Sequence, residues 1–224
     1  MADYINKNIL SQAYVHIEPT NFISHTELEG FKIHIQEFAR SRTDFYLHPD
    51  AEIEIEFEEG SLKARITILG TIGLLWQGVA SYPDFREGIS LLYNDSKRLA
   101  EYIVSESQYI AGSKHENVIR LEARTGIIGS VQKVIGQLER IKNGARGSMD
   151  ANELAKELLQ ANNEIDKLLN NISNENDINI VQSGLAKTAS SIPERPYPPG
   201  NKHNSDESIL IYQNRRKKLI GRLS

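Results

Sequence analysis

The chain has 224 residues, of which 25% are charged and 39% are hydrophobic, a composition typical of a globular protein with one or two domains. It contains no cysteine, which excludes disulfides and thiolate metal sites. Its charge is uneven, because residues 1–60 carry twelve acidic and four basic residues, whereas residues 207–224 carry one acidic and five basic residues. A basic end favours an acidic partner, which includes the chain itself or a second copy of it.

Residues 1–7 contain no basic stretch that leads into an apolar one, so we expect no cleaved secretion signal and a cytoplasmic location. Alternation over residues 13–18 indicates a strand. Ser24 and Glu27 have the spacing of a capping box, and apolar residues then recur at helical spacing to about Arg42. The N-terminal part therefore predicts a small β-α-β-β unit that is completed by a hairpin.

Residues 52–69 form the clearest hairpin, because isoleucine, phenylalanine and leucine alternate with charged residues on both sides of Glu59 and Gly60. The row of glutamates predicts a solvated face and not a metal site, since residues along one strand spread apart and do not converge on an ion. A two-residue turn predicts the pairs Phe57–Leu62, Ile55–Ala64 and Ile53–Ile66 on one face, and Glu56–Lys63 and Glu54–Arg65 on the other.

Residues 66–83 carry no charge, and their 18 residues reach the lower limit of a membrane span. The hairpin, however, uses this segment to about Leu69, and the remaining dozen residues are typical of a buried segment. We favour burial and keep a membrane-perturbing segment at residues 66–82 as an alternative. The candidate membrane or hinge residues are Gly70, Gly73, Leu74, Leu75, Trp76 and Gly78.

Three long helices are predicted at residues 84–111, 116–143 and 150–172. The short link at residues 144–148 predicts that the second and third helices run antiparallel. The third has heptad spacing, and its candidate interaction residues are Leu154, Leu158, Ile165, Leu168 and Ile172. The expected fold class is α+β and mostly α, with the β-α-β-β unit packed on this bundle in one domain over residues 1–172.

Residues 173–206 are rich in Asn, Ser and Pro and predict an extended linker. Residues 207–224 predict a short basic helix that docks on a partner protein or on another copy of the chain. Contact of this helix with anionic lipid or nucleic acid stays open, although five basic residues provide few phosphate contacts. Its candidate interaction residues are Ile209, Ile211, Tyr212, Arg215, Arg216, Lys217 and Lys218.

Arg42 and His48 are the only catalytic candidates, and they are separated by five residues. An arginine and a histidine at this spacing resemble the catalytic signature of HEPN ribonucleases, in which the motif lies on a helix. Here Phe45, Tyr46 and Pro49 predict a loop or strand. No pair of histidines has metal-binding spacing, and no phosphate loop or serine nucleophile motif is present. We predict no cofactor, metal or small-molecule substrate.

The leading hypothesis is a bacterial-type soluble protein that is a non-enzymatic, oligomerising interaction protein, most simply a subunit of a multiprotein complex. Heptad stripes, glycines on a helix face and a docking tail favour it. A membrane-perturbing effector is the first alternative, and a nucleic-acid-binding protein or HEPN-like ribonuclease is the second.

Overall fold

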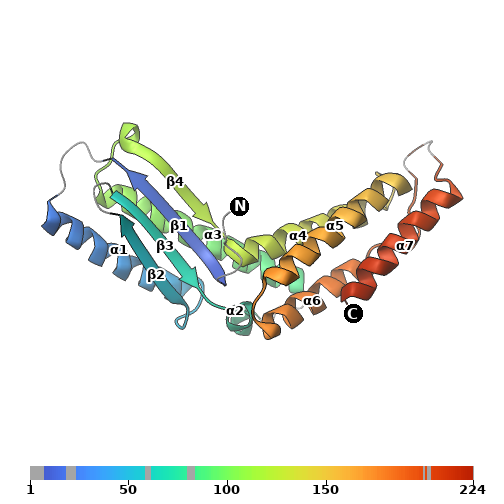
Figure 1. Ribbon diagram of the computed structural model, residues 1–224, viewed down its shortest axis with the longest axis horizontal. Helices are drawn as coiled ribbons and strands as arrows, with labels where there is room; N and C mark the ends of the chain where they lie inside the picture. The colour runs from blue at the N-terminus through green and yellow to red at the C-terminus, as the bar shows by residue number, and fades with distance from the viewer. Residues whose placement is uncertain are drawn as a thin grey trace. The chain divides into compact units, whose positions relative to one another are not determined.

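The computed structural model describes residues 8–18, 24–58, 62–79, 84–198, 200 and 203–223. In these residues it has the predicted α+β fold, in which seven α-helices accompany a four-stranded antiparallel sheet (Figure 1). The chain divides into two compact units. We call residues 1–83 and 87–129 the sheet unit, and residues 84–86 and 130–224 the helical unit. The boundary at residues 129 and 130 differs from the predicted domain end at residue 172.

The sheet unit has the split βαβ arrangement, in which a strand order of β2-β3-β1-β4 places the first strand beside the third and fourth. Its predicted β-α-β-β start is confirmed, and the hairpin of β2 and β3 follows the first helix. The elements are β1 (Ile9–Ile17), α1 (His25–Tyr46), β2 (Glu52–Glu58), β3 (Leu62–Leu69), α2 (Ile72–Val79), α3 (Phe85–Ile110) and β4 (Val118–Arg124).

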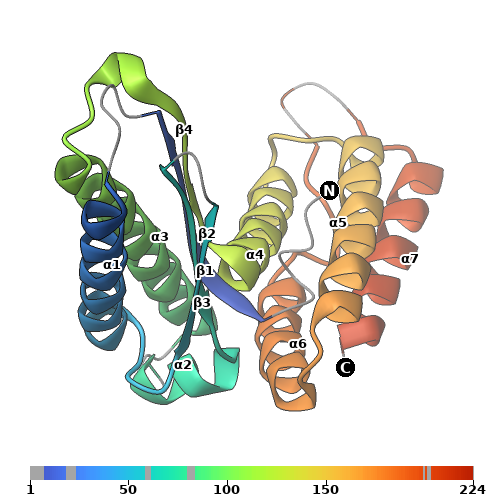
Figure 2. The same cartoon turned by 60° about the vertical axis from the view of Figure 1, so that its left-hand side comes forward.

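Helices α1 and α3 cover the same face of the sheet (Figure 2). The ring of Phe31 in α1 meets that of Phe57 in β2 edge to face at 6.1 Å. The hydroxyl of Ser11 in β1 donates to the carbonyl of Ser96 in α3 over 2.8 Å. The capping box is confirmed, because the Glu27 amide donates to Ser24 Oγ and the Ser24 amide donates to the Glu27 carboxylate.

The hairpin has the predicted faces but not the predicted register. Glu58 lies opposite Lys63 and Glu56 lies opposite Arg65, two residues away from the prediction. The two-residue turn was wrong, because three residues separate Glu58 from Leu62. A shift of two residues keeps every side chain on its face, and it forms the ion pairs Lys63–Glu58 at 3.0 Å and Arg65–Glu56 at 2.8 Å.

The predicted helix over residues 116–143 begins instead as a strand. Residues 118–124 form β4, which pairs antiparallel with β1, and α4 starts only at Gly126. Gly126 has a φ of +47°, and a Cβ atom there would lie 1.8 Å from the carbonyl oxygen of Ile9. The backbone of β1 therefore comes close to Gly126, where only a glycine fits, whereas Gly136 has open space around it.

The helical unit is a bundle of α4 (Gly126–Gly144), α5 (Ala151–Asn171), α6 (Glu175–Ser190) and α7 (Asp206–Leu223), with the first turn of α4 in the sheet unit. Helices α4 and α5 run antiparallel as predicted, since Lys133 pairs with Glu164 and Arg140 pairs with Glu157. The predicted linker over residues 173–206 was wrong, because α6 lies within it. Asn174 caps α6 by accepting from the Asp177 amide, and buried side chains recur every four residues, at Val181, Leu185 and Ala189.

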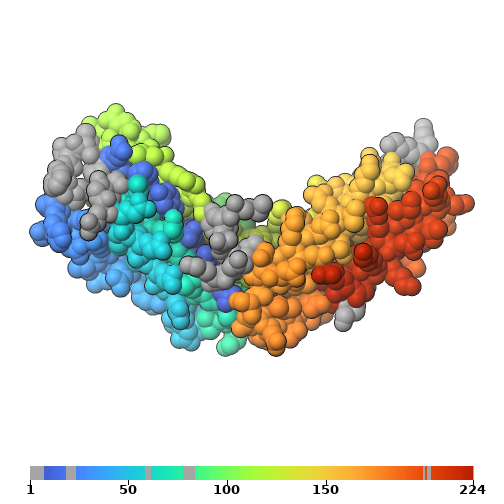
Figure 3. Space-filling view, viewed as in Figure 1, coloured from blue at the N-terminus to red at the C-terminus, as the bar shows by residue number. Residues whose placement is uncertain are grey.

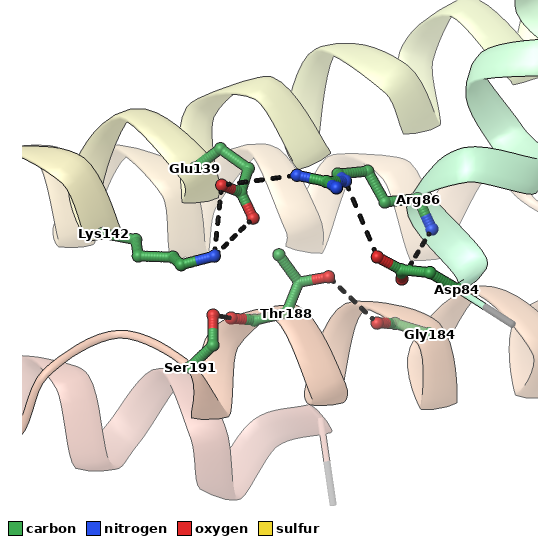
Figure 4. A network of polar contacts seen from close by, with 7 residues as sticks. All are labelled: Asp84, Arg86, Glu139, Lys142, Gly184, Thr188 and Ser191. Atoms are coloured by element: carbon green, nitrogen blue, oxygen red, sulfur yellow. Dashed lines mark hydrogen bonds and ion pairs between the residues drawn. The ribbon is translucent and has the colours of Figure 1, made fainter.

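Polar contacts join α4 to the start of α3 in the helical unit, while α6 has hydrogen bonds of its own, from Thr188 to the Gly184 carbonyl and from Ser191 to the Thr188 carbonyl (Figure 4). The carboxylate of Glu139 in α4 accepts from Lys142 at 3.1 Å and pairs with Arg86 at 3.8 Å. Gly184 in α6 lies against the ring of Phe85, and a Cβ atom at residue 184 would come within 2.3 Å of that ring. The absence of a side chain at residue 184 therefore lets α6 pack on Phe85.

Candidate interaction surface

The outer sides of α1 and α3 form a surface of aromatic rings and one arginine. Tyr46 of α1 stacks on Tyr102 of α3 with ring centroids 5.7 Å apart. The Arg42 guanidinium lies 5.0 Å from the ring centroid of Phe38 and 5.9 Å from that of Tyr102. We call Phe38, Arg42, Phe45, Tyr46, Tyr102 and Tyr109 the aromatic surface.

Several of these rings are turned to solvent. Phe45 is 76% exposed and Tyr109, two turns beyond Tyr102 on α3, is 82% exposed, whereas Tyr102 is 47% exposed. Soluble proteins expose single large side chains routinely, but a group of rings on neighbouring helices is characteristic of a contact surface.

Polar contacts hold the two helices in position beneath these rings. His34 Nε2 of α1 lies 2.9 Å from the Glu106 carboxylate of α3. A hydrogen bond with Tyr102 is the main cause of a raised pKa at Tyr46. These contacts join α1 to α3 beside the aromatic surface.

A groove of about 1160 Å³ runs along α1 and the edge strand β2. In Figure 3, α1 (blue) and β2 (cyan) are at the surface of the sheet unit. Arg40 fixes the link between them, because its guanidinium donates to the carbonyls of Ala51 at 2.8 Å and Pro49 at 3.1 Å. The lining residues are Ile33, Gln36, Glu37, Arg40, Ser41, Arg42, Asp44, Phe45, Ile53 and Ile55.

The structure does not join the ribonuclease-like pair. Arg42 lies on α1, which continues to Tyr46, so the predicted loop or strand at residues 45 and 46 was wrong. Arg42 contacts aromatic rings, while His48 Nδ1 accepts from the Asp50 amide over 3.1 Å. The two side chains contact different groups, and no hydrogen bond or ion pair links them in the part of the chain that the structure describes.

The basic C-terminal segment docks on its own chain. Helix α7 has the predicted length and begins one residue earlier than predicted, and the Tyr212 hydroxyl donates to the Pro193 carbonyl over 2.5 Å. Arg215 donates to the Ala155 carbonyl and Arg216 donates to the Ile192 carbonyl. Of the other candidates in α7, Ile209 is half-buried, whereas Ile211, Lys217 and Lys218 are exposed.

The heptad residues of α5 lie inside the bundle. Each is at most 4% exposed, so they hold the chain's own helices together and contact a second chain only if the bundle opens. The five residues are Leu154, Leu158, Ile165, Leu168 and Ile172.

The uncharged segment at residues 66–82 is largely buried or half-buried in its described part, as we favoured. Ile66 and Ile68 are buried in β3, and Leu75 is 2% exposed in α2. Gly70 follows β3, and a Cβ atom there would lie 2.8 Å from Leu10. Gly73, Leu74 and Trp76 are half-buried in α2, Gly78 also belongs to α2, and residues 80–82 lie outside the described residues. Among the described residues, no helix combines the length and the apolar character needed to cross a bilayer.

No group of three or more metal-binding side chains occurs among the described residues. Comparisons with protein-family models, curated proteins and solved structures give no match to this chain.

None of the rings of the aromatic surface was predicted as an interaction residue, and Tyr102 and Tyr109 are the two that α3 provides. Both lie on the polar side of α3, away from its apolar stripe. Their spacing of seven residues on that polar side is the signal that identifies them, because a helix brings such residues to one face.

Proposed function

We propose that this chain is a non-enzymatic interaction protein that works in an assembly, either as a homo-oligomer or as a subunit of a multiprotein complex. The aromatic surface on α1 and α3 is the observation that carries this proposal. Tyrosine, phenylalanine and arginine are enriched where proteins bind each other, and truncation of tyrosine or arginine often costs the most affinity.

The physical basis is the contact area that these side chains offer. A tyrosine buries a large ring while only two torsions are fixed, so its ordering costs little entropy. The Arg42 guanidinium already lies near the rings of Phe38 and Tyr102, and the residue is exposed, so it is accessible to a partner. The exposed rings of Phe45 and Tyr109 extend the area that a partner covers.

The helical unit supports the proposal less strongly. Its apolar residues and part of its basic tail are occupied within the chain, and the exposed Leu210, Lys217 and Lys218 remain for a partner. Removal of the tail is consequently a poor test of assembly, because it uncovers the side of α5 on which α7 packs.

The test is co-purification from the cells that produce the protein. A tagged full-length chain is compared with Tyr102→Ala/Tyr109→Ala and with a control, Tyr197→Ala, whose ring is 67% exposed in the helical unit. We expect the double variant to lose the bound chains and the control to keep them. Equal recovery of the same proteins with all three forms would show that the aromatic surface does not bind them.

A further inference from the structure

The edge strand β2 carries charge of one sign on one face. Glu52, Glu54, Glu56 and Glu58 alternate with apolar residues and are all exposed. Among the described residues, β2 pairs only with β3, so its other edge is not joined to a strand. An open edge presents unpaired backbone groups that a further strand can use.

Strand β3 shows which side chains suit the face of glutamates. Lys63 pairs with Glu58 at 3.0 Å and Arg65 pairs with Glu56 at 2.8 Å. Glu52 and Glu54 instead lie opposite Leu69 and Thr67, which carry no charge. A strand on the open side of β2 therefore meets carboxylates that β3 leaves without a basic neighbour.

The other face of β2 is apolar. Ile53 and Ile55 are half-buried and line the groove along α1, together with Ile33, which is 58% exposed. A strand added at this edge places every second side chain beside these isoleucines on the apolar face, because side chains alternate between the faces of a sheet. The residues between them then lie beside the glutamates.

A second copy of the chain does not meet these requirements through β2. Pairing β2 with its equivalent sets glutamates beside glutamates, and directly opposed like charges destabilise a sheet. The charge of β2 therefore disfavours pairing with β2 of a second copy and favours a strand that carries the opposite charge.

We propose that β2 binds an extended segment of another protein in which apolar residues alternate with lysine or arginine, and that this segment adds to the sheet beside β2. Backbone hydrogen bonds supply affinity, while the glutamates and isoleucines select the sequence. The inference rests on the proposed function in that the partner is a protein, but it uses a different surface from Tyr102 and Tyr109.

The probe is a fluorescent peptide with the sequence of residues 62–69, the strand that β2 already accepts within the chain. A second peptide carries Glu in place of its Lys and Arg. Fluorescence anisotropy measures binding of each peptide to the full-length protein. We expect the basic peptide to bind at least about tenfold more tightly than the acidic one.

The variant Glu52→Lys/Glu54→Lys is expected to reverse this preference. Its control is Glu116→Lys/Glu194→Lys, which makes the same change in net charge at two exposed residues outside β2 and keeps the preference for the basic peptide. If the lysine variant does not fold, Glu52→Gln/Glu54→Gln is used and reduces the preference. Equal binding of the two peptides, or no change on reversal of the charges of β2, would overturn the inference.

Light scattering of the same samples tests whether a second copy of the chain, and not a different protein, occupies the edge of β2. Dimers that dissociate in the Glu52→Lys/Glu54→Lys variant, without peptide binding, would assign the edge to a second copy and overturn the inference. Tyr102→Ala/Tyr109→Ala is expected to leave peptide binding unchanged. Failure of the peptide to bind, with co-purification still dependent on Tyr102 and Tyr109, would therefore reject this inference alone.

Discussion

The Arg42 guanidinium in α1 lies 5.9 Å from the ring centroid of Tyr102 in α3. This contact, together with that to Phe38, places the arginine in the aromatic surface, whereas His48 accepts from the Asp50 amide. A cation over a ring at an exposed site contributes about 0.5–1 kcal/mol. Arg42 is therefore a structural part of the aromatic surface.

Replacement of Arg42 is expected to weaken the packing of α1 on α3. Arg42→Ala lowers the free energy of unfolding by about 0.5–1 kcal/mol. A double-mutant cycle with Tyr102→Leu in urea unfolding measures the coupling. His48→Ala is the comparison, since it does not couple to Tyr102. An equal coupling of Tyr102 to His48 would contradict this assignment of Arg42.

The contact of Gly184 with Phe85 predicts a steric effect. Gly184→Ala places a methyl group within 2.3 Å of the Phe85 ring, and overpacking of this kind costs about 1–3 kcal/mol. Gly136→Ala is the matched control, because its helix position has open space and alanine there stabilises by about 1 kcal/mol. Thermal unfolding checks that Gly184→Ala lowers stability and that Gly136→Ala raises it. Adding Phe85→Leu to Gly184→Ala is expected to restore part of the lost stability.

The position of α7 predicts which residues stabilise the chain. Leu219 is 1% exposed, and Leu219→Ala is expected to lower the free energy of unfolding by about 2–5 kcal/mol. Leu210 lies on the same helix and is 58% exposed, so Leu210→Ala changes it by less than about 0.5 kcal/mol. If urea unfolding gave equal effects for the two changes, the docking of α7 on its own chain would be incorrect.

Burial raises the pKa of Tyr212 to about 12, and the nearby Arg216 opposes the rise. Because the folded pKa exceeds the unfolded value of 10.0, the stabilisation is fully present below pH 10 and is lost as the pH rises toward 12. Tyr212→Phe is expected to remove this part of the alkaline loss. Urea unfolding of both forms between about pH 9 and pH 12 measures this difference. If the free energy of unfolding falls equally with pH in both forms, the pKa of Tyr212 is not raised.

Local signals in the sequence predicted the elements whose contacts are close along the chain. Ser24 and Glu27 form the expected capping box, and Asp150 caps α5 four residues before Leu154, the first residue of its predicted apolar stripe. The faces of the hairpin were also predictable, because alternation fixes which side chains share a face. Its register was not, since register depends on the length of the connection as well as on the pattern.

The errors arose where tertiary pairing or a cap decided the structure. Residues 118–124 carry apolar residues that also suit a helix, and pairing with β1 made them a strand. The Asn-rich start of α6 indicated a linker, although Asn174 is an N-terminal cap. The aromatic surface was not predictable from one helix, because Arg42, Tyr46 and Tyr102 meet only when α1 and α3 lie side by side.

The molar mass of the native particle tests the proposed assembly most directly. The full-length chain is purified gently from the cells that produce it through a cleavable tag, the tag is removed, and the particle is measured by light scattering after size exclusion. We predict a mass above the 25.3 kDa of one chain, which falls to 25.3 kDa in Tyr102→Ala/Tyr109→Ala and not in Tyr197→Ala. A particle of 25.3 kDa for the unaltered protein, with no other chain present, would contradict the account.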